Sequence, residues 1–255
     1  MLEPPPHDDT RPNVLEAVRF PFQGPDWTHN MLLGSVFVII PLVGPLALGG
    51  WMCEVLQRLE RSHPRPVPKL DFRDFGHYLG RGVAPFVAGL VLGMLCAFLW
   101  MGGFVVALGG GLLVSSASEN ALLAGVFYGL GGILCLVGLA AAAIIGHPAM
   151  LRAELTEKIG EGLALGKLFR FARIAWWQIL YRTFLLTCLS VPLALGGYCL
   201  CLVGVYAAMV VIVMANAHLR WQIYRYYLAR GGEPIAVKPA EALPSEVPPA
   251  PGPWR

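Results

Sequence analysis

Four long apolar blocks, separated by short polar or basic segments, dominate the chain. They run over residues 31–56, 83–114, 121–145 and 179–219. A helix needs about 20 consecutive apolar residues to cross the roughly 30 Å hydrocarbon core of a bilayer. Each block can therefore hold at least one membrane-spanning helix, and the pattern predicts an all-α, polytopic membrane bundle over residues 27–230.

Proline and glycine divide the first and the last block. Residues 41–45, with the sequence Pro-Leu-Val-Gly-Pro, either kink a single helix or turn the chain fully. Pro192 and the glycines at 196–197 are expected to split the last block in two. The sequence Pro-Leu-Ala-Leu-Gly-Gly occurs at 45–50 and at 192–197, through an internal duplication, as two equivalent helix turns, or by chance. We favour a turn in each block and about six spans; a kinked first helix would leave five.

The two middle blocks differ in length. Residues 83–114 form an uncharged block of 32 residues, which as a helix would be about 48 Å long. This helix must tilt, break at the glycines 102–103, or end at the glycines 109–111. Residues 121–145 are expected to form one span, closed by His147-Pro148.

The polar segments between the blocks predict interfacial helices. In residues 58–82, and again in 149–175, apolar side chains alternate with charged ones, as in a helix that lies at a membrane surface. Residues 1–26 are predicted to form a partly disordered tail with a short surface helix around Val14–Arg19. Residues 231–255 contain seven prolines and are predicted to be disordered.

Composition supports a membrane location. The chain is 56% hydrophobic and 14% charged, with a mean hydropathy of +0.61. Soluble domains are about 45–50% apolar and about 25% charged. These values exclude an ordinary cytosolic enzyme.

Lysine and arginine alternate along the chain in a way that sets its orientation. Residues 58–82 and 146–182 hold six each, and five follow from Arg220 onward, whereas 115–120 and 192–197 hold none. Basic loops remain on the cytoplasmic side of a membrane. We therefore expect the basic segments and the C-terminus to be cytoplasmic, with the N-terminus beside them in a six-span chain and outside in a five-span chain.

Two charged residues, Glu54 and Arg182, fall inside the apolar blocks, where ionisable groups are functional candidates. Glu54 lies four residues before Arg58, a spacing that allows a pair on one helix face, and the Arg182 side chain can reach the headgroups. Alternatively, Glu54 and Arg182 pair with each other between helices and gate a pathway.

Three polar residues, His147, Asn216 and His218, complete the candidate intramembrane polar site with Glu54 and Arg182. They fall at expected cytoplasmic helix ends, where they could converge, with His77, on a metal or a phosphate. The chain lacks the H-x-x-x-H and H-E-x-x-H spacings, and it has no nucleophile elbow, P-loop or dinucleotide fingerprint. We therefore predict no enzyme activity, no catalytic or metal-binding residue and no cofactor.

Glycine replaces polar residues in the two middle blocks. The pairs Gly89/Gly93 and Gly125/Gly129 have the spacing that lets membrane helices approach closely. They favour packing within the bundle or with a partner over a polar pore, while an apolar pathway for lipid stays open.

A basic segment beside phenylalanine predicts contact with lipid. Lys167, Arg170 and Arg173 are expected to attract anionic lipid, although ordinary anchoring of a basic loop explains them equally well. We expect membrane lipids as partners and no nucleic acid.

Several short motifs resemble a prokaryotic membrane family, domain-of-unknown-function family 4013. They are Arg-Phe-Pro-Phe at 19–22, Asp-Trp at 26–27, Ile-Pro-Leu-Val-Gly at 40–44, Gly-Gly-Trp at 49–51, and the ending over 204–225. The resemblance covers about residues 15–228. It implies a polytopic helical protein, expected in the prokaryotic cytoplasmic membrane, and brings no activity or catalytic residue.

These observations predict a non-enzymatic structural or accessory membrane subunit that packs with a protein partner or with itself. The alternative is a transporter or a lipid-handling membrane protein. The alternative predicts a cavity lined by Glu54, Arg182, Asn216 or His218, whereas the first hypothesis predicts a closed bundle.

Overall fold

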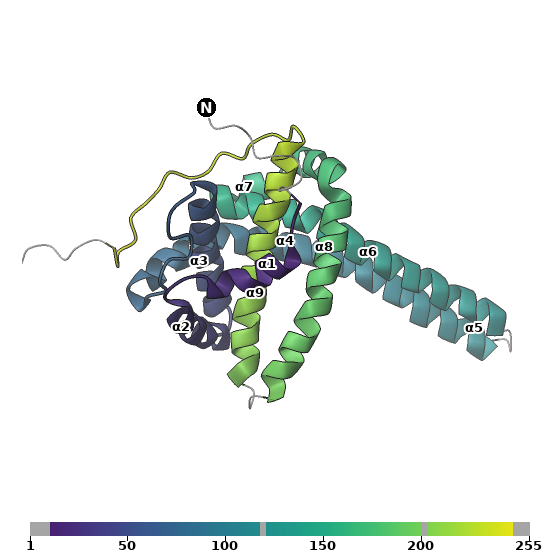
Figure 1. The fold of residues 1–255 in the computed structure, drawn as a ribbon. Helices are drawn as coiled ribbons and strands as arrows, with labels where there is room; N and C mark the ends of the chain where they lie inside the picture. Colours follow the sequence, from purple (N-terminus) through teal and green to yellow (C-terminus); the bar gives the residue numbers. More distant parts are fainter. Residues whose placement is uncertain (1–10, 118–120, 200–202, 247–255) are drawn as a thin grey trace, which may run out of the picture.

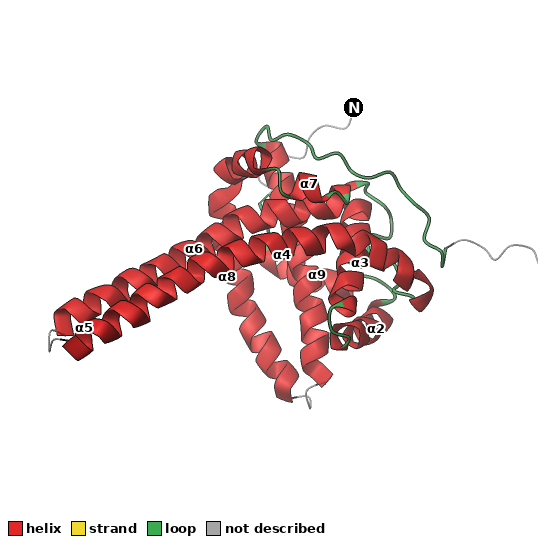
Figure 2. Ribbon diagram, turned by 180° about the vertical axis from the view of Figure 1, so that it is seen from behind, coloured by secondary structure: helices red, strands yellow, loops and turns green. Residues whose placement is uncertain are grey.

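The computed structural model describes residues 11–117, 121–199 and 203–246, and the regular structure of these residues is helical. The helices form a body and two long hairpins that point away from it in different directions (Figure 1). The rear view shows the same arrangement, with loops gathered at the body (Figure 2). The predicted all-α architecture is confirmed.

The first apolar block forms two helices, α2 (Trp27–Ile39) and α3 (Val43–Glu60). Leu42, between them, has a φ of 62°, and a side chain at Gly44 would fall on the carbonyl of Phe37. The expected turn is therefore confirmed, and the single kinked helix is wrong.

The α2–α3 pair is shorter than a bilayer crossing. Its 13 and 18 residues correspond to about 20 and 27 Å at 1.5 Å per residue. Most of α3 is buried, with Trp51, Met52 and Leu56 at the centre of the core. The first two of the six expected spans are thus a short hairpin of the body.

The first long hairpin contains the two middle blocks. A short 3-10 turn, η2 (Phe72–Asp74), leads into α4 (Phe75–Val105), the π-helix η3 (Val106–Gly110) and α5 (Gly111–Ala117). The antiparallel partner is α6 (Ala121–Thr156).

Three expectations about this hairpin are wrong. The apolar residues from Phe75 onward belong to α4 and not to a separate interfacial helix. The helix neither breaks at glycines 102–103 nor ends at 109–111, because the π-helix η3 connects α4 directly to α5. Pro148 lies inside α6, which continues to Thr156. Membrane-type helices tolerate proline because neighbouring groups satisfy the freed backbone.

The second long hairpin consists of α8 (Leu165–Cys199) and α9 (Val203–Ala229), preceded by the single turn α7 (Ile159–Gly162). Pro192 lies inside α8 and does not split the block there. The block is divided into two helices as expected, but α8 ends at Cys199 and α9 begins at Val203; residues 200–202 lie outside the described residues. The repeated Pro-Leu-Ala-Leu-Gly-Gly therefore occupies the start of α3 and the end of α8, so its two copies are not equivalent turns.

The N-terminal helix α1 (Val14–Arg19) is present as expected, followed by the 3-10 turn η1 (Phe20–Phe22). Asn13 caps α1 by accepting hydrogen bonds from the amides of the first turn. The Phe20 ring stacks on His218 of α9 at a centroid distance of 4.2 Å. The predicted disorder of residues 1–10 lies outside the described residues.

Four helices of the described residues are long and apolar enough to cross a membrane: 72–116, 121–156, 165–199 and 204–229. Their apolar side chains are widely exposed along both hairpins. The chain is an integral membrane protein, and the stretches 83–151 and 183–219, which contain most of both hairpins, hold no lysine or arginine.

Candidate functional site

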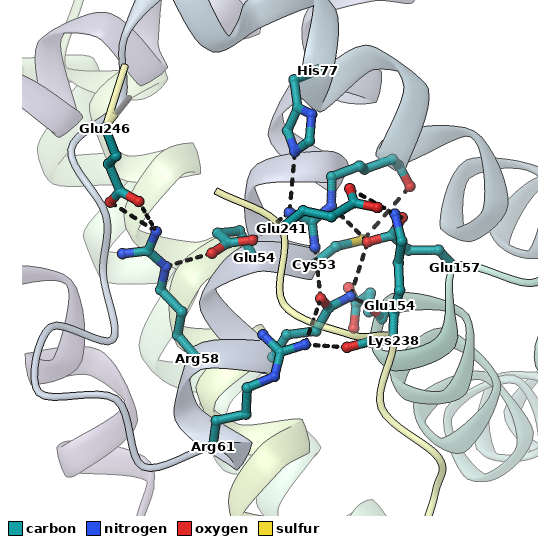
Figure 3. Close-up of polar contacts among 12 residues, drawn as sticks. Cys53, Glu54, Arg58, Arg61, His77, Glu154, Glu157, Lys238, Glu241 and Glu246 are labelled. Atoms are coloured by element: carbon teal, nitrogen blue, oxygen red, sulfur yellow. Dashed lines mark hydrogen bonds and ion pairs between the residues drawn. The ribbon is translucent and has the colours of Figure 1, made fainter. Parts of the chain in front are cut away.

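A network of buried charges joins α3, α4 and the end of α6 inside the body (Figure 3). At its centre Arg81 of α4 donates hydrogen bonds to Glu54 and Gln57 of α3 and to Glu157, just after α6. The Arg81–Glu157 and Arg81–Gln57 bonds are both 2.6 Å long. The side chains of Arg81 and Glu54 are each only 5% exposed, so the pair lies away from solvent.

A second ion pair extends the network to α9. Arg220 donates to both carboxylate oxygens of Glu154 on α6, which is 2% exposed. The Gln57 amide donates to the Glu154 carbonyl at 3.0 Å and to Glu157 at 2.9 Å. These contacts tie together residues that are 66 to 100 positions apart in the sequence.

The chain after α9 crosses the body as an extended segment, residues 231–246, called the C-terminal strap below (Figure 1). The Lys238 amide donates to the Leu155 carbonyl at 3.0 Å, and its ammonium group to Glu157 at 2.9 Å. Glu246 accepts a hydrogen bond of 2.9 Å from Arg58 (Figure 3). The strap therefore covers the charge network.

Further contacts hold the strap along its length. Ser245 donates from its amide and hydroxyl to the buried carboxylate of Asp74, at 2.8 and 2.6 Å. The side chains of Ile235 and Leu243 are buried in the core. The prediction of disorder is thus wrong for residues 231–246, while 247–255 lie outside the described residues.

Hydrogen bonds inside the network favour the charged form of Glu54. Burial of Glu54 opposes ionisation, but hydrogen bonds from Arg58 and Arg81 outweigh it and hold the pKa of this carboxyl below its ordinary value. Glu157 faces both Arg81 and Lys238. Because each carboxylate has a cationic partner, the arrangement is suited to holding helices and strap in one register.

Replacing Asp74 by alanine should loosen the strap. The substitution removes both acceptors of Ser245, and we expect faster hydrogen exchange over residues 238–246 with the helices unchanged. Asp71→Ala is the matched control, because Asp71 pairs with Arg73 at the surface. Unchanged exchange in Asp74→Ala would show that this anchor does not hold the strap.

The five residues of the candidate polar site do not converge in the structure. Glu54 pairs with Arg58 at the i,i+4 spacing, as one alternative predicted, and with Arg81. Arg182 contacts Gln178 and lies over the Tyr181 ring instead. The Glu54–Arg182 gate is therefore wrong.

The remaining three polar residues have separate surroundings. The Thr183 hydroxyl lies 3.0 Å from His147 Nε2, and the Asn216 amide donates to the Ile212 carbonyl one turn earlier. The His218 ring stacks on Phe20 and on Trp221 of α9. Among the described residues, no three His, Cys, Asp or Glu side chains are grouped so that they could hold a metal.

Three of the four glycines in the expected pairs do not pack the hairpin. Nothing lies within 4 Å of a Cβ built at Gly93, Gly125 or Gly129. Other glycines make the close α4–α6 contact: at Gly103 a Cβ would lie 2.8 Å from Cys135 Sγ, and at Gly131 it would meet Ala107. Gly89 does face α6, because its Cβ position lies 3.3 Å from the sulfur of Met150. The expected packing within the bundle therefore holds for Gly89 alone, and packing of the other three glycines with a partner stays a prediction.

The three basic residues expected at lipid differ in their contacts. Lys167 pairs with Glu161 at 2.8 Å and Arg170 with Glu233 at 2.9 Å. Arg173 is exposed and has no ion pair within the described chain.

Sequence reasoning missed most of the network. Arg81, Glu154, Glu157 and Lys238 lie in polar segments that were expected to face solvent or headgroups. One local feature pointed to a buried charge: Arg81 lies two residues before the uncharged block of 32 residues. A paired buried charge and a solvated one look alike in such a segment.

Comparison with known proteins gives one match. A family described as "Protein of unknown function (DUF4013)" matches residues 33–217, which is well over half of the chain. The matched region contains α3, both long hairpins except the end of α9, and the Glu54, Arg81, Glu154 and Glu157 part of the network. Searches among curated proteins and among solved structures gave no match.

Proposed function

Because the chain belongs to the DUF4013 family of proteins of unknown function, we propose its role from its own geometry. We infer that it is a non-enzymatic accessory membrane subunit. Its α6 helix packs against a membrane-spanning helix of another subunit, through the face that carries Gly125 and Gly129.

This proposal rests on one observation: some glycines of α6 face α4, whereas others face outward. Gly131 and Gly138 face α4, whereas Gly125, Gly129 and Gly132 are open to the outside. The outward glycines are spaced four and three residues apart, so they lie on one helix face. Small residues at this spacing let two membrane helices approach closely.

The surroundings of this face suit a helix partner. Leu122, Ile133 and Leu136 on α6 are 80%, 59% and 68% exposed. Neither middle block contains a charged residue. A hydrophobic helix could therefore pack there without burying an unpaired charge.

Isoleucine at both Gly125 and Gly129 should abolish the association. The protein would be extracted gently from its native membrane, and copurifying proteins and oligomeric mass would be quantified by mass spectrometry. We expect a subunit at near-equal stoichiometry with the wild type and its loss by about tenfold or more in the variant, because branched side chains hold the helices apart.

Gly196→Ile is the matched control. Gly196 is another open glycine on a membrane-spanning helix, so it tests insertion and handling without touching α6. An unchanged set of copurifying subunits in the Gly125/Gly129 variant would overturn the proposal.

A lipid-handling role is the second candidate, supported by an apolar pocket of about 220 Å³ between α8 and α9. Leu186, Leu193 and Val211 contribute to its lining, and none of Glu54, Arg182, Asn216 and His218 does. This lining fits an acyl chain better than a polar solute. A lone protein that retains one defined lipid in the same extraction would favour this candidate over the first.

A further inference from the structure

A polar pocket of about 310 Å³ lies beneath the C-terminal strap. Its wall on one side comes from the last turn of α6, from α7 and from the start of α8. The other wall is the strap itself, from Glu233 to Pro239. The pocket is separate from the apolar pocket between α8 and α9, with which it shares no lining residue.

Positive charge predominates in the lining. Four basic residues, Arg152, Lys158, Lys167 and Lys238, face two acidic ones, Glu161 and Glu233. Glu233 is already paired with Arg170 outside the pocket, and Lys238 with Glu157 and Glu241. The uncompensated charge therefore resides on the α6–α7–α8 side.

A single carboxylate serves two cations on that side. Glu161 accepts from Lys167 at 2.8 Å and from Arg152 at 2.6 Å. The hydrogen bonds from Lys167 and Arg152 lower the pKa of Glu161 to about 2. One carboxylate neutralises one of its two cations, so a positive charge is left over.

Two donors remain without a partner. Arg152 is 6% exposed, and its buried Nε has no hydrogen-bond partner although its Nη2 donates to Glu161. The exposed Lys158 ammonium group forms no ion pair within the described chain. The hydrogen bonds of Lys158 are made by its backbone: its amide donates to Thr156 Oγ1, and its carbonyl accepts from the amides of Glu161 and Gly162. A buried guanidinium donor without an acceptor costs folding free energy.

We propose that this pocket binds a phosphate group. A phosphate presents several acceptor oxygens with negative charge, which suits the excess of cationic side chains that line the pocket, Lys158 among them. The volume accommodates a phosphate with a small organic group attached, either a lipid headgroup or a soluble phosphorylated molecule.

The position of the pocket allows both sources. Lys167 lies nine residues before Trp176 on α8, about 14 Å along the helix, and the Trp176–Trp177 pair has the character of an interfacial belt. The pocket is thus on the body side of the membrane surface, within reach of both headgroups and solutes.

Inorganic phosphate is the first probe. Full-length protein in nanodiscs of phosphatidylcholine would be titrated with phosphate by calorimetry, at constant ionic strength set with chloride. We expect saturable binding at one site per chain, weakened about tenfold by Lys158→Ala, because a hydrogen bond between charged groups is lost. Lys158→Glu should abolish binding.

Arg173→Ala is the matched control, because Arg173 is an exposed cation on α8 that does not line the pocket. Its affinity for phosphate should equal that of the wild type. If Arg173→Ala and Lys158→Ala lost the same affinity for phosphate, general surface charge would explain the binding, and the proposal would be overturned. Absence of saturable binding to the wild type would overturn it as well.

A second titration distinguishes the two sources of the phosphate. In nanodiscs containing phosphatidylglycerol, a site that accepts headgroups is already occupied, so the apparent affinity for inorganic phosphate falls. If the site accepts soluble ligands alone, the affinity is the same in both nanodiscs. Either result supports the pocket as long as Lys158→Ala weakens phosphate binding and Lys158→Glu abolishes it.

Discussion

Replacing Arg81 by methionine is expected to destabilise the body by about 3–5 kcal/mol. This is the cost of removing one partner from a buried ion pair, because the other charge is left uncompensated. Arg81 serves two carboxylates and one amide, on Glu54, Glu157 and Gln57. The free energy of unfolding would be measured by denaturant titration of the protein in detergent, followed by tryptophan fluorescence.

A surface arginine provides the comparison. Arg73 pairs with Asp71 at 3.3 Å, but its side chain is 72% exposed, and exposed pairs contribute about 0–1 kcal/mol. Arg73→Met should therefore change the free energy of unfolding little. If both variants lost the same free energy of unfolding, the buried Arg81 network would stabilise the protein no more than an exposed ion pair does.

A double-mutant cycle tests whether the network acts as a unit. Combining Arg81→Met with Glu157→Gln should cost less than the sum of the two single variants, because the second change removes a carboxylate that the first left without its arginine. Glu157→Gln also removes the ion pair of Glu157 with Lys238, so part of its cost remains in the double variant. Strict additivity would contradict a direct Arg81–Glu157 interaction in the folded state.

Alanine at Gly82 is expected to be the second most damaging change. A Cβ there would fall on the carbonyl oxygen of Leu46 and 3.0 Å from the backbone nitrogen of Gly50. Overpacking typically costs about 1–3 kcal/mol. Because the obstacle is backbone and cannot rotate away, we expect a loss near 3 kcal/mol in the free energy of unfolding, with α3 and α4 forced apart.

Gly80→Ala is an unusually close control for this prediction. It lies two residues away on the same helix and has nothing within 4 Å of its Cβ position. Alanine is favoured over glycine in a helix by up to about 1 kcal/mol, so Gly80→Ala should be neutral or slightly stabilising. A loss in Gly80→Ala as large as in Gly82→Ala would place the cause in the helix itself and not in its crossing with α3.

Local sequence signals predicted the helices better than their ends. The turn at residues 41–45 was recognised because two prolines and a glycine fall within five positions, and α2 and α3 meet there. Similar signals misplaced the ends of α6 and α8, which continue through Pro148 and Pro192. A proline removes one backbone hydrogen bond, and the tertiary surroundings decide whether the helix survives that loss.

The C-terminal strap is a second case in which tertiary contacts overrode a local sequence signal. Seven prolines after residue 231 predicted disorder, and residues 231–246 contain few apolar side chains with which to build a core. Yet Ile235 and Leu243 fill positions in a core made by other segments, and Ser245 and Glu246 meet Asp74 and Arg58. An extended chain can be ordered by a surface that its own composition does not reveal.

The sequence by itself determined the membrane class, the all-helical architecture and the short α2–α3 turn. These follow from the length of apolar blocks and from backbone chemistry, which act over a few neighbouring residues. The tertiary structure alone decided which charges pair, which glycines face a neighbour and where the strap lies. Those outcomes depend on contacts such as Arg81 with Glu157, 76 residues apart, and pairing at that distance is set by how the helices pack.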